Sequence, residues 1–227
     1  MRPASLCILA LTLLPLSAHA HAWHQGYGFT DGLIHPLNGA EHFLAMLSIG
    51  LLSAQIGGRA IWLVPTLFVI VIGIGGMTAS LLIEEAKINY WLYVPIQFSV
   101  ILSVILLGLV IFRHTLFPRW LIYTMAGLFA FCHGYIHGNG IPMAVSFMEY
   151  AAGFMTATAG IHLFGVIVGL EAVRTPARLL ALRYTGLIIA LIGLTIGYLQ
   201  RDALKTFYLE LTAPPARVYN TPDSTTP

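Results

Sequence analysis

Long apolar runs, repeated along the chain, constrain the fold more than any other feature of the sequence. Crossing about 30 Å of hydrocarbon takes about 20 mostly apolar residues in a helix, which also satisfies its own backbone hydrogen bonds. Six segments meet or approach this length: residues 32–56, 61–83, 90–112, 120–137, 143–170 and 184–200. Of the 227 residues 58% are hydrophobic and only 9% charged, against roughly a quarter charged in soluble domains. The sequence therefore predicts an all-α membrane protein, a bundle of six transmembrane helices.

The first twenty residues have the features of a secretory signal. Arg2 gives the positive start, residues 6–16 form an apolar stretch, and residues 18–20 read Ala-His-Ala, an Ala-x-Ala cleavage site. The apolar stretch is about half as long as a spanning helix needs. A cut after Ala22 fits the same rule. We expect a cleaved signal peptide at 1–20, a six-helix membrane domain at 21–200, and an external, disordered tail at 201–227.

Arginines in the loops predict the orientation. With the mature N-terminus outside, the cytoplasmic loops hold six arginines, whereas the outer loops hold one lysine, Lys87. This distribution agrees with the positive-inside rule. The six arginines are Arg59, Arg113, Arg119, Arg174, Arg178 and Arg183. We therefore expect a multi-pass protein of the bacterial inner membrane with both mature termini outside.

Small residues at four-residue spacing predict where the helices pack. Glycine pairs of the form G-x-x-x-G let two helix backbones approach closely in lipid. Three such pairs occur: Gly134/Gly138, Gly165/Gly169 and Gly193/Gly197. They predict a compact bundle and carry no chemistry of their own.

Four histidines and one carboxylate form the candidate metal site. His35 and His42 are two helical turns apart in the first span, so we expect them on one helix face, with Glu41 nearby. His133 and His137 end the fourth span at the i, i+4 spacing that offers two imidazoles to a metal. Both pairs fall in the outer part of the membrane in the expected topology. An ionisable group there costs about 2.5–3.5 kcal/mol or more, so it normally faces a partner or a watery cavity. Imidazole suits nickel, copper, zinc and iron.

An interruption is expected in the first span. Pro36 and Gly39 both disfavour a regular helix. Glu41 lies about 100° from His42 around a regular helix, so it joins the site only if the helix is locally unwound. The predicted metal site therefore comprises His35, Glu41, His42, His133 and His137.

Other interpretations of these and neighbouring residues stay open. The histidines could be packing residues at helix ends, although four histidines and a carboxylate at one depth favour a metal. His162 fits a relay site or a structural histidine equally, Glu149 fits a solvated carboxylate better than a ligand, and Cys132 fits a small core residue. His21, the N-terminus after cleavage at the first site, and His24 either capture metal or are merely solvated.

These motifs resemble the HupE/UreJ family of nickel and cobalt permeases. The resemblance rests on residues 35–46 (HPLNGAEHFLAM) and 133–138 (HGYIHG), followed by Pro142, Tyr150, Gly153-Phe154 and His162. The chain has Glu41 where the family pattern has Asp, and Gly140 where it usually has Glu. The resemblance implies uptake of a divalent transition-metal ion, nickel first, by a protein that is not an enzyme and has no catalytic residues or cofactor.

Composition and motifs also limit the other function classes. A formal charge of +2 without a basic run argues against nucleic acid. One H-x-x-x-H is too few for a di-iron membrane enzyme, and an absorption spectrum would identify a haem protein. A cobalt or copper permease and a non-transporting metal-binding accessory protein remain alternatives.

The expected partners are a divalent metal ion and the lipid bilayer. A homo-oligomer or metalloenzyme-maturation partners stay open. Since no nucleotide-binding motif occurs in the sequence, energy would come from an ion gradient, a partner or trapping inside the cell.

Overall fold

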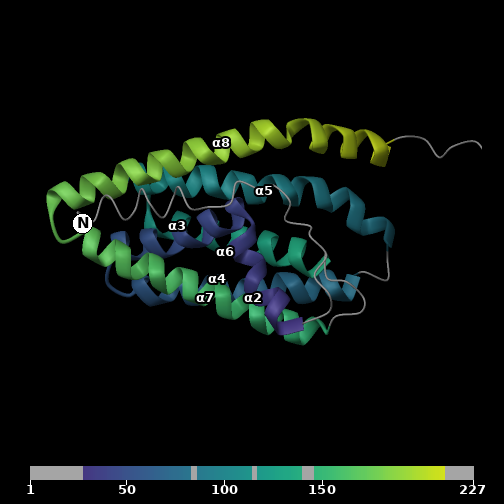
Figure 1. Ribbon diagram of the computed structural model, residues 1–227, viewed down its shortest axis with the longest axis horizontal. Coiled ribbons are helices and arrows are strands. Elements are labelled where there is room, and N and C mark those ends of the chain that lie inside the picture. Colours follow the sequence, from purple (N-terminus) through teal and green to yellow (C-terminus); the bar gives the residue numbers. More distant parts are fainter. Residues whose placement is uncertain (1–27, 83–85, 114–116, 140–145, 213–227) are drawn as a thin grey trace, which may run out of the picture.

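The computed structural model describes residues 28–82, 86–113, 117–139 and 146–212, and all regular structure in these ranges is helical (Figure 1). The helices are α2 Gly28–Asn38, α3 Ala40–Ile56, α4 Ala60–Leu82, α5 Ala86–Arg113, α6 Arg119–Asn139, α7 Phe147–Ala172 and α8 Pro176–Thr212. The all-α prediction is confirmed. The expected signal peptide, His21, His24 and the end of the tail lie outside the described residues.

Several of these helices have the length and apolarity of membrane spans. Within the described ranges, four pass both criteria: α4, α7, Pro95–Arg113 of α5 and Pro176–Asp202 of α8. The bent pair α2 and α3 adds a fifth if it is taken as one span. Helix α6 is 21 residues long, but His133 and His137 lower the hydropathy of its second half. The chain is therefore built as a multi-pass membrane protein.

The first expected span is two helices rather than one. Gly39 has an extended backbone (φ −103°, ψ 114°) between α2 and α3, whose axes differ by 82°. A side chain on Gly39 would lie 2.7 Å from the His42 ring, which explains the glycine at this bend. The interruption predicted from Pro36 and Gly39 is confirmed. The prediction that His35 and His42 share one face of a continuous helix is wrong, because the backbone changes direction between them.

The predicted glycine pairs lie at helix contacts. In α6, side chains on Gly134 and Gly138 would collide with the α4 backbone at Ile72 and Gly76. In α7, Gly165 faces the Leu47 carbonyl of α3, where an added Cβ would be 2.7 Å away. Gly169 and the α8 pair Gly193/Gly197 likewise meet neighbouring helices. All three pairs therefore serve close packing, as predicted.

Helices α5 and α8 lie side by side along one edge of the bundle (Figure 1). Gly108 of α5 faces Gly186 of α8 so closely that a Cβ on Gly108 would be 2.6 Å from the Gly186 carbonyl oxygen. Arg183 adds a hydrogen bond from its Nε to the Phe112 carbonyl at the end of α5 (2.8 Å). Helix α8 continues to Thr212, so the domain boundary expected at residue 200 falls inside a helix.

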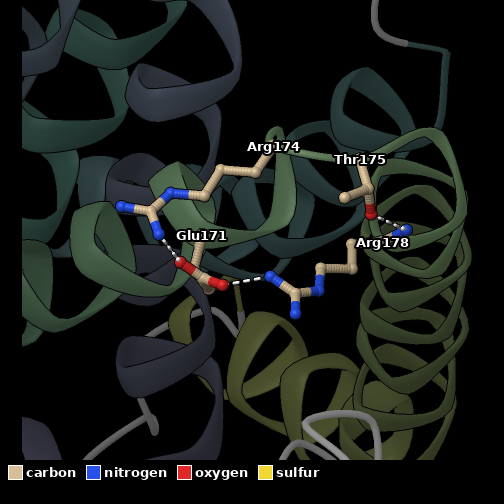
Figure 2. Close-up of polar contacts among 4 residues, drawn as sticks. All are labelled: Glu171, Arg174, Thr175 and Arg178. Carbon is tan, nitrogen blue, oxygen red and sulfur yellow. Dashed lines mark hydrogen bonds and ion pairs between the residues drawn. The ribbon is translucent and has the colours of Figure 1, made fainter.

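An ion-pair cluster joins α7 to α8 (Figure 2). Glu171, in the last turn of α7, contacts Arg174 at 2.8 Å and also pairs with Arg178 of α8. The backbone N–H of Arg178 donates to the Thr175 hydroxyl (3.3 Å), which caps the start of α8. These groups are largely exposed, so they shape the turn more than they stabilise the bundle.

Candidate metal centre

Three histidines from three helices meet at one end of the bundle. His35 of α2, His42 of α3 and His137 of α6 each bring a ring nitrogen to within 4.8 Å of the other two. The His42 and His137 ring centroids are 4.4 Å apart, and those of His35 and His137 are 4.6 Å apart. Zinc–histidine bonds measure about 2.0–2.1 Å, so two nitrogens on one such ion lie at most about 4 Å apart. Small ring rotations would therefore let this three-histidine cluster hold one ion.

The bend at Gly39 creates the cluster. It turns α2 across the start of α7, where Gly32 meets the Tyr150 backbone, and leaves His35 facing the first turn of α3. The His35 and His42 rings then lie 6.1 Å apart between centroids. Helix α6 delivers His137 from its last turn. The bend between α2 and α3 thus brings His35 close to His42, and the last turn of α6 brings His137 to both. The histidines do not meet along one helix face.

Two aromatic residues of α7 form a wall beside the cluster. Phe154 lies 4.4 Å from the His137 ring, and Tyr150 lies 5.9 Å from the His35 ring, centroid to centroid. Both aromatic residues are buried, as are His42 and His137, whereas His35 is half-buried. A small apolar pocket between α4, α6 and α7 reaches His137 and adds no further histidine or carboxylate. The cluster is therefore shielded from the bundle side and most accessible at His35.

Glu41 lies next to the cluster rather than within it. The side chain is buried, and its Oε1 atom is 4.0 Å from Nε2 of His42. That distance is too long for a hydrogen bond. The carboxylate can therefore offset part of a cation's charge without contacting it in this conformation.

His133 occupies a deeper position than the other three histidines. It is fully buried one turn before His137 on α6, with its ring 5.5 Å from that of His42. Its Nδ1 lies 2.8 Å from the Phe129 carbonyl oxygen, which can only accept, so Nδ1 carries the proton. Nε2 of the neutral ring then keeps a lone pair, and it has no hydrogen-bond partner among the described residues. Such a backbone bond is a common way to orient a metal-binding imidazole.

The remaining candidates lie apart from the cluster. Glu149 is exposed in the first turn of α7 and contacts Gly28, so it does not replace a ligand in this conformation. Cys132 is buried and free, as expected of a small core residue. His162 is buried in α7, farther from this end of the bundle. Gly140 lies outside the described residues.

Sequence reasoning missed Asp31. It lies one turn before His35 on α2 and close enough to Tyr150 to interact with it electrostatically. The D-x-x-x-H spacing could have revealed it, because residues four apart share a helix face. Asp31 adds a carboxylate near the accessible side of the cluster.

Comparisons with known proteins agree on one family. The family model described as HupE / UreJ protein matches residues 9–196. Protein HupE of Rhizobium leguminosarum bv. viciae is 34% identical over 186 residues, which cover 82% of this chain and 92% of that protein. No solved structure matches the chain significantly.

Proposed function

This chain belongs to the HupE/UreJ family of transporter-type membrane proteins, which are not enzymes, and on that premise we propose that it takes up nickel across the bacterial inner membrane. The observation that carries the proposal is the meeting of His35, His42 and His137 at one end of the bundle. Imidazole nitrogens suit late transition metals such as nickel and cobalt, whereas magnesium and calcium prefer oxygen ligands.

The proposed topology has six spans after removal of the signal peptide. They are the bent pair α2–α3 followed by α4, α5, α6, α7 and α8. Support comes from where the arginines lie relative to the cluster. Arg119 begins α6, which carries His137 in its last turn, and Arg59 follows α3, which carries His42 in its first turn. With the arginine-rich end in the cytoplasm, the three-histidine cluster would face the outside.

In the proposed mechanism, the hydrated ion arrives near Asp31 and His35, where the cluster is least buried. It exchanges water for imidazole nitrogens of His35, His42 and His137. The buried carboxylate of Glu41 offsets part of the ion's charge and so lowers the cost of dehydration. His133 would then receive the ion one turn deeper in the bundle.

Uptake of radiolabelled nickel by proteoliposomes containing the purified protein tests this function. We expect saturable uptake that excess cobalt inhibits and excess magnesium does not. Competition by copper and zinc in the same assay would rank the metals that the protein prefers. Thr156→Ala serves as a control, because Thr156 is exposed on α7 and bonds only its own helix at Ala152. Tight nickel binding without uptake would make the protein a metal-binding accessory protein instead of a permease. The absence of both nickel binding and nickel uptake would also refute the proposal.

A further inference from the structure

One face of α7 carries a column of buried side chains that extends below the three-histidine cluster. Tyr150, Phe154, Thr158 and His162 follow one another at four-residue spacing, and all four are buried. The first two pack against the cluster. His162 is fifteen residues into the helix, about 22 Å from its start at 1.5 Å per residue. The column therefore runs from the cluster into the middle of the bundle.

His162 ends this column in an environment that does not suit a packing residue. Its side chain is 1% exposed, and neither ring nitrogen has a hydrogen bond of normal geometry with a described residue. The backbone of Pro65 on α4 lies close enough to interact with the ring. A buried polar group without a proper partner costs about 1–3 kcal/mol. A leucine or phenylalanine would fill the same space without that cost, so the imidazole needs another reason to be there.

Phe68 of α4 links His162 to His133. The Phe68 ring centroid is 5.1 Å from that of His162 and 5.9 Å from that of His133. The two histidines therefore pack against one aromatic ring in the bundle core. His133 contributes an Nε2 lone pair that has no partner among the described residues.

Met46 and Thr158 occupy the level between the cluster and His162. Met46 lies one turn below His42 on α3, and its sulfur accepts a hydrogen bond from the Thr158 hydroxyl (3.4 Å). Both side chains are fully buried. A thioether is a soft ligand that favours late transition metals over hard cations. Three helices thus present metal-compatible atoms one turn or more below the cluster.

We infer that His133 and His162 form an inner metal station, which receives the transition-metal ion from the three-histidine cluster, with the Phe68 ring controlling passage between the two histidines. This inference rests on the proposed uptake function and assigns His162 a role in translocation rather than in capture. His133, one turn below His137, is the point of transfer.

The test separates capture from translocation in one variant. In proteoliposomes, His162→Gln should lower Vmax for nickel at least tenfold and change KM less than twofold. Cobalt serves as a spectroscopic probe: the variant should keep the visible absorption of Co²⁺ at the three-histidine cluster and lose that of Co²⁺ at the inner station. Leu163→Ala is the matched control, because the neighbouring side chain is half exposed on the outer face of α7.

Each outcome decides between the possibilities. Wild-type Vmax in folded His162→Gln overturns the inner station and leaves the uptake function intact. Loss of cobalt binding at the three-histidine cluster in the folded variant also overturns it, because His162 would then belong to capture. No nickel uptake by the wild type refutes both proposals. If His162→Gln does not fold, the wild-type stoichiometry decides: two Co²⁺ ions per chain support the station and one overturns it.

Discussion

The bundle has two halves that differ in what they bury. Almost all of the buried polar side chains belong to helices α3, α6 and α7, including His42, His133, His137 and His162. Helices α5 and α8 pack through small and aliphatic residues. Among their described side chains, the one buried polar group is Ser103, which bonds to the Val100 carbonyl of its own helix (2.6 Å). The buried polar side chains are therefore concentrated on α3, α6 and α7.

This difference suggests that the α5–α8 half supports the fold and that the other half carries the metal chemistry. Burying polar groups within a membrane is costly, so a chain that needs only stability would bury none. The α5–α8 pair shows that this sequence can build close helix contacts from small and aliphatic residues, as where Gly108 meets Ala190 and Gly186 meets Ile111. The buried histidines on the other side are the residues to which the proposed function gives a role in metal transport. Substitutions in the two halves should fail in different ways.

The largest effect is expected from loss of a cluster histidine. His42→Ala removes a buried ring of the three-histidine cluster, whose centroid lies 4.4 Å from that of His137 and 6.1 Å from that of His35. Removing even an outer-shell partner of a metal ligand costs about 10–100-fold, so losing a ligand should lower nickel affinity at least about 100-fold. Equilibrium binding and uptake, normalised to protein in the membrane, measure this. Normal uptake by both His42→Ala and His137→Ala would refute the metal site.

A smaller loss is expected at Glu41. Glu41→Gln keeps the size of the side chain and removes the charge 4.0 Å from the His42 ring. Because that carboxylate lies beside the cluster, nickel affinity should fall about tenfold, the lower end of the range for outer-shell partners. Glu41→Asp retains the charge and should keep much of the affinity. Equal affinity for Glu41→Gln and the wild type would show that the carboxylate does not contribute to binding.

In the α5–α8 half, substitutions should change abundance instead of affinity. Gly108→Ala places a methyl group 2.6 Å from the Gly186 carbonyl, and such overpacking typically costs about 1–3 kcal/mol. Gly127→Ala on α6 is the matched control, since an added Cβ there meets nothing within 4 Å. We expect less Gly108→Ala protein in the membrane, normal Gly127→Ala, and unchanged nickel affinity per molecule in both. An affinity loss in Gly108→Ala would mean that the two halves are coupled.

The same contrast shows what the sequence could predict. Long apolar runs and G-x-x-x-G pairs depend on local composition and spacing. The runs correctly predicted an all-α fold, although four or five of the described helices, not six, qualify as spans, and the glycine pairs correctly predicted helix contacts. The H-x-x-x-H motif placed His133 and His137 on one helix face, as the structure does. The relation of His35 to His42 could not be predicted, because it depends on the direction of the chain after Gly39. A bend of 82° is set by how α2 packs across α7, and spacing carries no information about that contact.

Depth was the other property that spacing could not resolve. The four histidines were expected at one level, but the i, i+4 separation of His133 and His137 corresponds to about 6 Å along a helix. That distance puts His137 in the cluster and leaves His133 beside Phe68. Asp31 was not predicted because it precedes the first expected span. Its electrostatic interaction with Tyr150 joins α2 to α7, and the sequence does not show that these helices are in contact.

The smallest effect is expected at Glu171, where the chain passes from α7 to α8 (Figure 2). The Glu171 side chain is 43% exposed and that of Arg174 is 71% exposed, so water screens their attraction. Exposed ion pairs contribute about 0–1 kcal/mol. Glu171→Gln removes the charge and keeps an oxygen that can accept from Arg178, so thermal unfolding in detergent should shift little. Nickel uptake per folded molecule should be unchanged, because Glu171 lies in the last turn of α7 and the three-histidine cluster packs against its first turns. A tenfold loss of uptake at normal abundance would contradict this view. It would mean that the α7–α8 turn moves during transport, and that the α5–α8 half takes part in translocation instead of supporting it.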